Sequence, residues 1–180
     1  FMIVVRYIYE VLQKEQGSEP MNTEQMGEIY DKYKNDVYRM AFAYCKNSAD
    51  AEDIMQETFI KLFTSNIIFE DESKRKSWLL KVTVNKCRDM FRSLRYKYSL
   101  TSIPLEEADL VYETPEESEV YHAVMALPTK YRLVIHLYYY EGYSIKEIGA
   151  VTGKNESAVQ TQLFRARKKL KGALGKELQL

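Results

Sequence analysis

Residues 144–171 read SIKEIGAVTGKNESAVQTQLFRARKKLK, and this stretch predicts two helices joined by a tight turn. Ser144 is a preferred N-cap residue, and Glu147 three positions later completes a capping box for the first helix. Residues 152–154 predict the turn, because Gly153 tolerates a left-handed backbone. Asn155 is a suitable cap for a second helix that runs to about Lys171.

The apolar residues of both predicted helices each fall on one face. They are Ile145, Ile148 and Val151 in the first helix and Val159, Leu163, Ala166 and Leu170 in the second. A short helix, a turn with glycine and a longer basic helix form the pattern of a helix-turn-helix. The outward residues that DNA would meet are Ser157, Gln160, Thr161, Phe164, Arg165 and Lys168. An ordinary helix pair with a solvated basic face is the alternative, but the cap, turn and charge together favour DNA binding.

A second basic helix is predicted over residues 76–96. Its apolar stripe is Leu80, Val84, Cys87, Phe91 and Leu94. The positions one residue further on form a neighbouring polar stripe of Lys81, Asn85, Arg88, Arg92 and Arg95. Trp78, Tyr96 and Tyr98 at the helix ends offer surfaces for base stacking, which suits single-stranded as well as duplex DNA. Core packing is the alternative for Trp78.

An acidic helix is predicted from Asp50 to Phe63, with Asn47 or Ser48 as its cap. Its inner face is Ala51, Ile54, Thr58 and Leu62, and its outer face is Glu52, Asp53, Gln56 and Glu57, flanked by Phe59 and Ile60. Acids in the first turn complement the helix dipole. A carboxylate-rich face edged by apolar side chains also describes a docking surface for a basic partner. The spacing alone leaves both interpretations open.

The remaining patterns complete an all-α chain of two small helical domains. A helical stripe from Met26 to Tyr44 opens an N-terminal bundle, and a helix from Thr129 to Glu141 precedes the helix-turn-helix. Residues 98–120 hold seven acids and no Lys or Arg, which predicts a flexible acidic linker. We therefore expect an N-terminal extension of unknown role at 1–20, the bundle at 21–97, the linker at 98–116 and the helix-turn-helix domain at 117–180.

The composition excludes several classes of protein. The 180 residues carry 26 basic and 26 acidic side chains, but residues 74–97 hold nine Lys or Arg against one acid. No apolar run approaches the roughly 20 residues of a membrane span. Two cysteines are too few for a disulfide scaffold, and the scattered His and Cys do not match zinc-ligand spacing. Since no phosphate loop or activated nucleophile is present, we expect a soluble intracellular protein that is no enzyme, with no catalytic residue, cofactor, metal or small-molecule substrate.

Three strings together resemble the bacterial sigma factors of the extracytoplasmic-function group (group IV) in the sigma-70 family. They are DAEDIMQETF at 50–59, WLLKVTVN at 78–85 and FRAR at 164–167, and the likeness covers about residues 24–172. The resemblance implies a non-catalytic cytoplasmic factor that binds core RNA polymerase and directs it to promoter DNA. Members of this family are usually held inactive by an anti-sigma factor, often membrane-anchored, so we expect such a partner.

The resemblance also implies roles for individual residues. Docking on the clamp helices of the polymerase would use Asp53, Gln56, Glu57 and Phe59. Contacts with the −10 element, including an extruded base held by Asn85, would use Trp78, Lys81, Asn85, Arg88 and Arg92. Reading of the −35 element would use Ser157, Gln160, Thr161, Phe164, Arg165 and Lys168. Many relatives carry basic residues where Gln160 and Gln162 stand, and this departure bears on the −35 sequence that is read.

A stand-alone helix-turn-helix regulator that binds operators unaided is the alternative function. It explains residues 144–171 equally well. It does not explain a docking motif ahead of a basic helix that carries Asn85.

Overall fold

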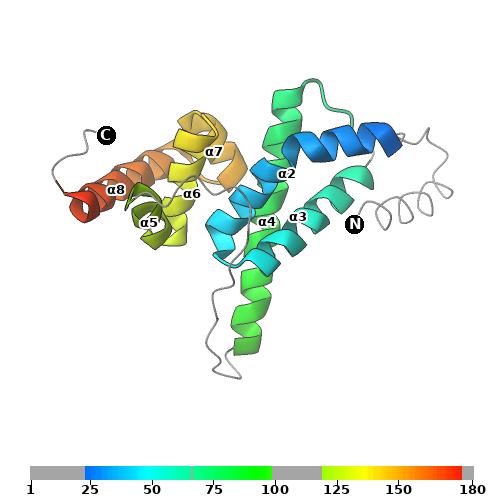
Figure 1. Ribbon diagram of the computed structural model, residues 1–180. Helices are drawn as coiled ribbons and strands as arrows, with labels where there is room; N and C mark the ends of the chain where they lie inside the picture. The colour runs from blue at the N-terminus through cyan, green and yellow to red at the C-terminus, as the bar shows by residue number, and fades with distance from the viewer. Residues whose placement is uncertain (1–22, 66, 99–118, 176–180) are drawn as a thin grey trace.

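The computed structural model describes residues 23–65, 67–98 and 119–175 (Figure 1). All regular structure in these ranges is helical, which confirms the all-α class. The elements are α2 (Thr23–Cys45), α3 (Ser48–Phe63), α4 (Glu72–Tyr98), α5 (Glu119–Ala126), α6 (Thr129–Ile135), η1 (His136–Tyr140), α7 (Ile145–Thr152) and α8 (Glu156–Leu174). The predicted extension at 1–20 lies outside the described residues. The predicted acidic linker at 98–116 also lies outside them, except for Tyr98.

Helices α2, α3 and α4 pack around one apolar core and form what we term the N-terminal unit (Figure 1). The expected cap of α3 is present, because Asn47 Oδ1 accepts a hydrogen bond from the Asp50 N–H at 2.9 Å. The predicted inner face of α3, which is Ala51, Ile54, Thr58 and Leu62, is buried as expected. This unit also buries both cysteines, whose Sγ atoms lie 3.9 Å apart as free thiols.

Helices α5, α6, η1, α7 and α8 form what we term the C-terminal unit. The single helix expected from Thr129 to Glu141 is instead an α-helix that widens into the π-helical turn η1. The Glu141 N–H donates to the His136 carbonyl at 3.2 Å, a bond that spans five residues instead of four. One widened helical turn leaves the apolar pattern of Leu133, Val134 and Leu137 intact. The spacing of apolar residues in the sequence therefore does not reveal the π-helical turn.

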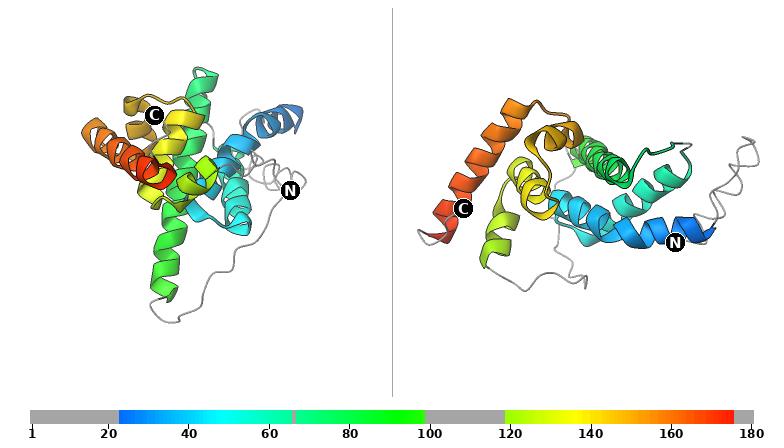
Figure 2. Two further views of the ribbon diagram at one scale, coloured as in Figure 1. Left: turned by 60° about the vertical axis from the view of Figure 1, so that its left-hand side comes forward. Right: turned by 90° about the horizontal axis from the view of Figure 1, so that it is seen from above.

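The two units pack against each other along α4 and the end of α2. Helix α4 contacts α7, and α2 contacts α6, as the views in Figure 2 also show. Met40, Leu80 and Val84 belong to the same buried cluster as the apolar residues of the C-terminal unit. Leu80 and Val84 are therefore buried as predicted, but in the cluster between the two units and not in the core of their own bundle. Within the described ranges, no helix has the length and apolar character needed to cross a membrane.

Candidate nucleic-acid interface and docking face

The helix-turn-helix forms for the local reasons that the sequence predicts. The Ser144 N–H donates to Glu147 Oε2 at 2.8 Å, and the Glu147 N–H donates to Ser144 Oγ at 3.3 Å, which completes the capping box. Gly153 has a φ of +66° and ends α7 in the left-handed conformation. Asn155 Oδ1 accepts from the Ala158 N–H at 2.8 Å and caps α8. Each of these features was predicted from the residue type and its position.

Gly149 sets how closely the turn approaches α7. A Cβ atom built at this position would lie 2.7 Å from the carbonyl oxygen of Lys154, which is closer than side-chain carbons approach backbone atoms. The atom that approaches Gly149 belongs to the backbone just after the turn and not to the body of another helix. The angle between α7 and α8 therefore depends on the absence of a side chain here.

The outward face of α8 carries every residue predicted to read DNA. Ser157, Gln160, Thr161, Phe164, Arg165 and Lys168 are all exposed. Phe164 keeps 68% of its surface accessible. The buried face is the predicted one, namely Val159, Leu163, Ala166 and Leu170. Side chains suited to base edges and to phosphates thus share one accessible face.

A pocket beside the start of α8 adds a residue that sequence analysis missed. Its lining includes Ser157, Thr161 and Arg165 from α8 together with Lys130 from α6. Lys130 is exposed and lies far from α8 in the sequence. Lys130 lies two residues after Pro128, in the first turn of α6. This position predicts a helix start but does not predict a contact with α8. The pocket gives the reading face a second cation beside Arg165.

The predicted basic face of α4 is only partly open. Lys81, Asn85 and Arg92 are exposed, and Arg92 lies 3.8 Å from Asp89 of the same helix. Arg88 is half-buried, with its Nη1 3.4 Å from Asn85 Oδ1 and its Nη2 donating to the Thr152 carbonyl of α7. The side chains of Leu94, Arg95, Tyr96 and Tyr98 lie outside the described part of the chain.

Trp78 and the segment before α4 form an apolar edge to this face. The Trp78 ring is half-buried and meets Phe69 edge-on at 5.7 Å, so the packing alternative accounts for part of its surface. Ile68, next to Phe69, leaves 95% of its surface exposed. Ile68 was not among the residues predicted to lie on a functional surface. The signal available was an apolar triplet at 67–69 inside an otherwise polar connection.

The acidic face of α3 is accessible at the predicted carboxylates. Asp53 and Glu57 are exposed, and Glu57 Oε2 pairs with Lys86 Nζ of α4 at 2.6 Å. Gln56 is half-buried between them. Burial, and next the neighbouring charge of Asp53, raise the pKa of Asp50 at the start of the helix. The face therefore concentrates negative charge on one side of the N-terminal unit.

Phe59 requires a correction, because it was expected on this docking face. Its side chain is fully buried, with its ring 4.9 Å from that of Tyr30 and 5.9 Å from that of Phe63. Helix α3 is covered by α2 on one side and α4 on the other, so its buried sector is wider than a single stripe. Phe59 thus supports the acidic helix from beneath and does not present its ring to a partner.

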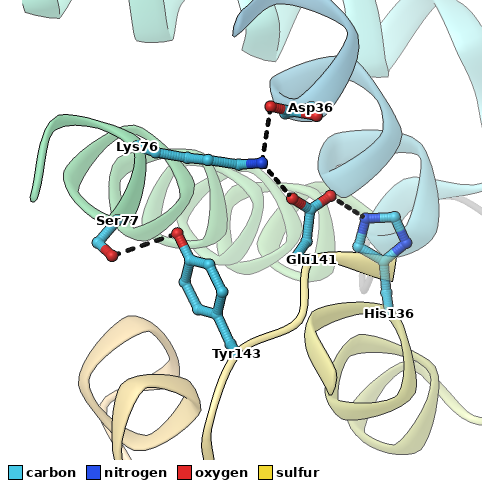
Figure 3. Close-up of polar contacts among 6 residues, drawn as sticks. All are labelled: Asp36, Lys76, Ser77, His136, Glu141 and Tyr143. Atoms are coloured by element: carbon cyan, nitrogen blue, oxygen red, sulfur yellow. Dashed lines mark hydrogen bonds and ion pairs between the residues drawn. The ribbon is translucent and has the colours of Figure 1, made fainter. Parts of the chain in front are cut away.

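The described residues include no cluster of three or more His, Cys, Asp or Glu side chains that could hold a metal ion. A charged cluster of Asp36, Lys76 and Glu141 joins the two units, and Figure 3 shows it.

Comparison with known proteins identifies both units. Residues 29–96 match the family model for sigma-70 region 2, and residues 117–170 match the one for sigma-70 region 4. The chain is 32% identical over 146 residues to the RNA polymerase sigma factor SigV of Bacillus subtilis, covering 81% of this chain and 88% of SigV. It is 33% identical over 150 residues to the ECF RNA polymerase sigma factor SigM of the same organism, covering 80% of this chain and 91% of SigM.

Solved structures show the same fold. The sigma factor RpoE of Bartonella quintana, in complex with the anti-sigma factor NepR, superposes with a TM-score of 0.72 at 20% identity, covering 84% of this chain and 98% of RpoE. CnrH in complex with the cytosolic domain of CnrY superposes with a TM-score of 0.60 at 22% identity, covering 98% of both chains.

Proposed function

The chain belongs to the extracytoplasmic-function sigma factors of the sigma-70 family, which are non-enzymatic factors of RNA polymerase, and from this premise we propose which surfaces carry its function. The family models span the two units that hold the acidic face, the basic helix and the helix-turn-helix. A stand-alone regulator is not favoured, because a helix-turn-helix protein that acts without polymerase does not require the sigma-70 region 2 that residues 29–96 match. The observation that supports the proposal most is the presence of all three surfaces on one chain.

The acidic face of α3 docks on core RNA polymerase in this proposal. Asp53, Gln56 and Glu57 make the contact, and buried Phe59 keeps the helix in position. The Lys86 side chain pairs with Glu57 in the free protein, but an exposed pair contributes only about 0–1 kcal/mol and is readily exchanged for a partner's cation. Docking therefore needs no rearrangement of the N-terminal unit.

A charge reversal tests this docking face. Asp53→Arg should abolish co-elution with core polymerase, since it places a cation at the centre of a surface that attracts cations. Asp31→Arg on α2 is the matched control, because Asp31 is also exposed and, among the described residues, its ion pair is with Lys34 of its own helix. Co-elution of the Asp53 variant at the wild-type level would remove this face from the proposal.

Promoter DNA is bound at two places in this proposal. Lys81, Asn85, Arg88 and Arg92, with the Trp78 edge, contact the −10 element, where cations offset the few kcal/mol that unstacking a base costs. The α8 residues Ser157, Gln160, Thr161, Phe164, Arg165 and Lys168 read the −35 element. Lys130, which shares the pocket at the start of α8, adds a phosphate contact.

The proposal includes an inhibitory partner and a compartment. One structural neighbour is the sigma factor RpoE in complex with the anti-sigma factor NepR, and another is CnrH in complex with the cytosolic domain of CnrY. This supports regulation of the present chain by an anti-sigma factor. Because promoter DNA and core polymerase are cytoplasmic, the chain acts in the cytoplasm in this proposal.

In vitro transcription is the direct test of the whole proposal. Core RNA polymerase is incubated with host genomic DNA, with and without the chain, and the 5′ ends of the RNA are mapped. We expect new, discrete start sites that share upstream sequence at −10 and −35. An unchanged set of start sites would overturn the proposal, and a footprint of the chain alone on duplex DNA would then favour the stand-alone regulator.

A further inference from the structure

The two cysteines of the chain meet in the core of the N-terminal unit, although 42 positions separate them in the sequence. Cys45 is the last residue of α2, and Cys87 lies in the interior of α4. Their Sγ atoms are 3.9 Å apart, and both are free thiols. The sequence contains only these two cysteines. Any disulfide within one molecule therefore joins Cys45 to Cys87.

The two thiols differ in their access to solvent. Cys45 keeps 7% of its surface exposed, whereas Cys87 is completely buried. Cys45 lies where α2 ends, and the next residue, Lys46, turns the chain with a φ of +57°. Cys87 lies beneath this point, on the apolar stripe of α4. A small oxidant that arrives from solvent therefore meets Cys45 first.

The charges around the two thiols differ in the same sense. Arg132 is 2% exposed, and it donates from Nε to the Ala43 carbonyl and from Nη2 to the Tyr44 carbonyl at 3.2 Å. Its guanidinium thus lies beside the backbone that leads into Cys45. Burial lowers the pKa of Arg132, and the charge of Cys45 opposes this shift. Reactive cysteines lie near a cation and in partial contact with solvent, and Cys45 meets both conditions.

Cys87 is suited to a second step and not to the first. Its contact with the Cys45 sulfur, and next its burial, raise the pKa of Cys87, so this residue stays a neutral thiol. A buried neutral thiol reacts slowly with peroxide, because the thiolate is the nucleophile. A thiol does condense with a sulfenic acid that forms next to it. Cys87 is therefore placed to resolve an oxidised Cys45.

We propose that Cys45 and Cys87 form an oxidation site for hydrogen peroxide, and that the resulting disulfide weakens binding to the −10 element. The Cys45 sulfur attacks one peroxide oxygen, the O–O bond breaks, and water leaves behind a sulfenic acid. Cys87 Sγ then attacks the Cys45 sulfur, the S–O bond breaks, and the hydroxyl leaves as water with the Cys87 proton. The two thiols lose two electrons in total, and these reduce one peroxide to two waters.

The disulfide affects the helix that carries the proposed −10 residues. An S–S bond is about 2.05 Å long, so the sulfurs must approach each other by about 1.9 Å from their present separation of 3.9 Å. Because Arg132 holds the end of α2, part of this movement falls on α4. Cys87 lies between Asn85 and Arg88, and residues of one helix move together. Oxidation should therefore displace Asn85 and Arg88 from positions that fit the −10 element. This effect rests on the proposed function, whereas formation of the disulfide does not.

Thiol counting in the full chain tests whether the disulfide forms. The reduced protein is treated with hydrogen peroxide under native conditions, catalase removes the peroxide, and the chain is then unfolded and labelled with a maleimide. Untreated protein should take two labels, and oxidised protein should take none and have a monomer mass lower by two hydrogen atoms. Dithiothreitol should restore both labels. Two labels after peroxide treatment would overturn the proposal, as would a disulfide that forms only in urea-unfolded protein.

Two single variants test the order of the two steps. In Cys45→Ala, the buried Cys87 should lose its thiol at least about 10-fold more slowly than the wild type loses its thiols, since the reacting form is the thiolate. In Cys87→Ala, Cys45 lacks its partner, and dimedone should trap its sulfenic acid. Cys87→Ser replaces Cys87→Ala if circular dichroism shows a loss of helix. Equal rates of thiol loss in Cys45→Ala and the wild type would overturn the role of Cys45 as the first site.

Transcription separates this inference from the proposed function. Only the factor is oxidised, and the peroxide is removed before core polymerase is added. The oxidised wild type should give several-fold less transcript than the reduced wild type from the same start sites, and dithiothreitol should restore it. Cys45→Ala is the matched control, because it cannot form the disulfide and its transcript should not change with peroxide treatment.

The outcomes of the two assays are independent. Equal transcript from oxidised and reduced wild type would overturn the effect of the disulfide on −10 binding. A reduced wild type that directs no start sites would contradict the proposed function, while thiol counting would continue to report on the disulfide by itself.

Discussion

A single methyl group at Gly149 should weaken the helix-turn-helix, whereas the same change elsewhere in the C-terminal unit should strengthen it. In a helix interior, Ala is favoured over Gly by about 1 kcal/mol. At Gly149 the new Cβ would lie 2.7 Å from the Lys154 carbonyl oxygen, and backbone on both sides of the turn must move to relieve this contact. Overpacking costs about 1–3 kcal/mol, and we expect about 2–3 kcal/mol here because the atom in contact belongs to the backbone and not to the end of a flexible side chain. We expect Gly149→Ala to lower the unfolding free energy by about 1–2 kcal/mol after the propensity gain.

Gly172→Ala provides the comparison, because Gly172 lies in α8 and a Cβ there meets no atom within 4 Å. This variant should gain about 0.5–1 kcal/mol. The assay is urea unfolding of the full chain followed by circular dichroism, with binding to a −35 duplex as a second readout. Weaker DNA binding should accompany only the Gly149 change, since it alone alters the angle between α7 and α8. Equal or higher stability of Gly149→Ala relative to the wild type would refute the steric argument.

Three further predictions follow from individual contacts. Arg165→Ala should weaken binding to the −35 element by about 1–3 kcal/mol and relax selectivity for one base pair, as measured by competition among duplexes; unchanged selectivity would count against α8 as the reading helix. Asn47→Ala should lower thermal stability by about 1 kcal/mol because it removes the cap of α3, and a melting curve identical to the wild type would contradict this role. The pKa of Glu141 is lowered in the folded protein despite burial, through His136 and Lys76, so its stabilising effect is present above the unfolded value of about 4.3 and is lost as the pH falls below it; Glu141→Gln should therefore reduce the acid dependence of the unfolding free energy between pH 6 and pH 3, as measured by urea titrations at each pH.

The helix caps, the turn and the exposed face of α8 were predictable because each depends on residues that lie within a few positions of one another in the sequence. The caps at Asn47, Ser144 and Asn155 each depend on a side-chain oxygen and an N–H group three residues further on, and both are visible in the sequence. The turn at Gly153 is predictable for the same reason. The residues on the outward face of α8 follow from the helical repeat once the apolar stripe is known.

The features that were missed depend on which elements meet in space. The apolar stripe of α3 does not reveal that two helices cover it, and so the burial of Phe59 was not foreseen. Lys130 joins the pocket on α8 from 27 residues before Ser157, and no spacing rule connects the two. The burial of Arg132 was not predicted either, because a charged residue is buried only when partners from distant segments are present, and its carbonyl partners at the end of α2 lie almost 90 residues earlier in the chain.

The double role of Arg132 has a consequence for genetics. Its Nη1 donates to the Met125 and Leu127 carbonyls at the end of α5, and its Nη2 donates to the Tyr44 carbonyl at the end of α2. Loss of the guanidinium would therefore uncap both helices and damage the C-terminal unit together with its contact with α2. Lys76 has no second role of this kind, because its ion pairs with Asp36 of α2 and with Glu141 after η1 do not cap a helix. A screen for variants that lose −35 binding should therefore recover changes at Arg132 more often than changes at Lys76.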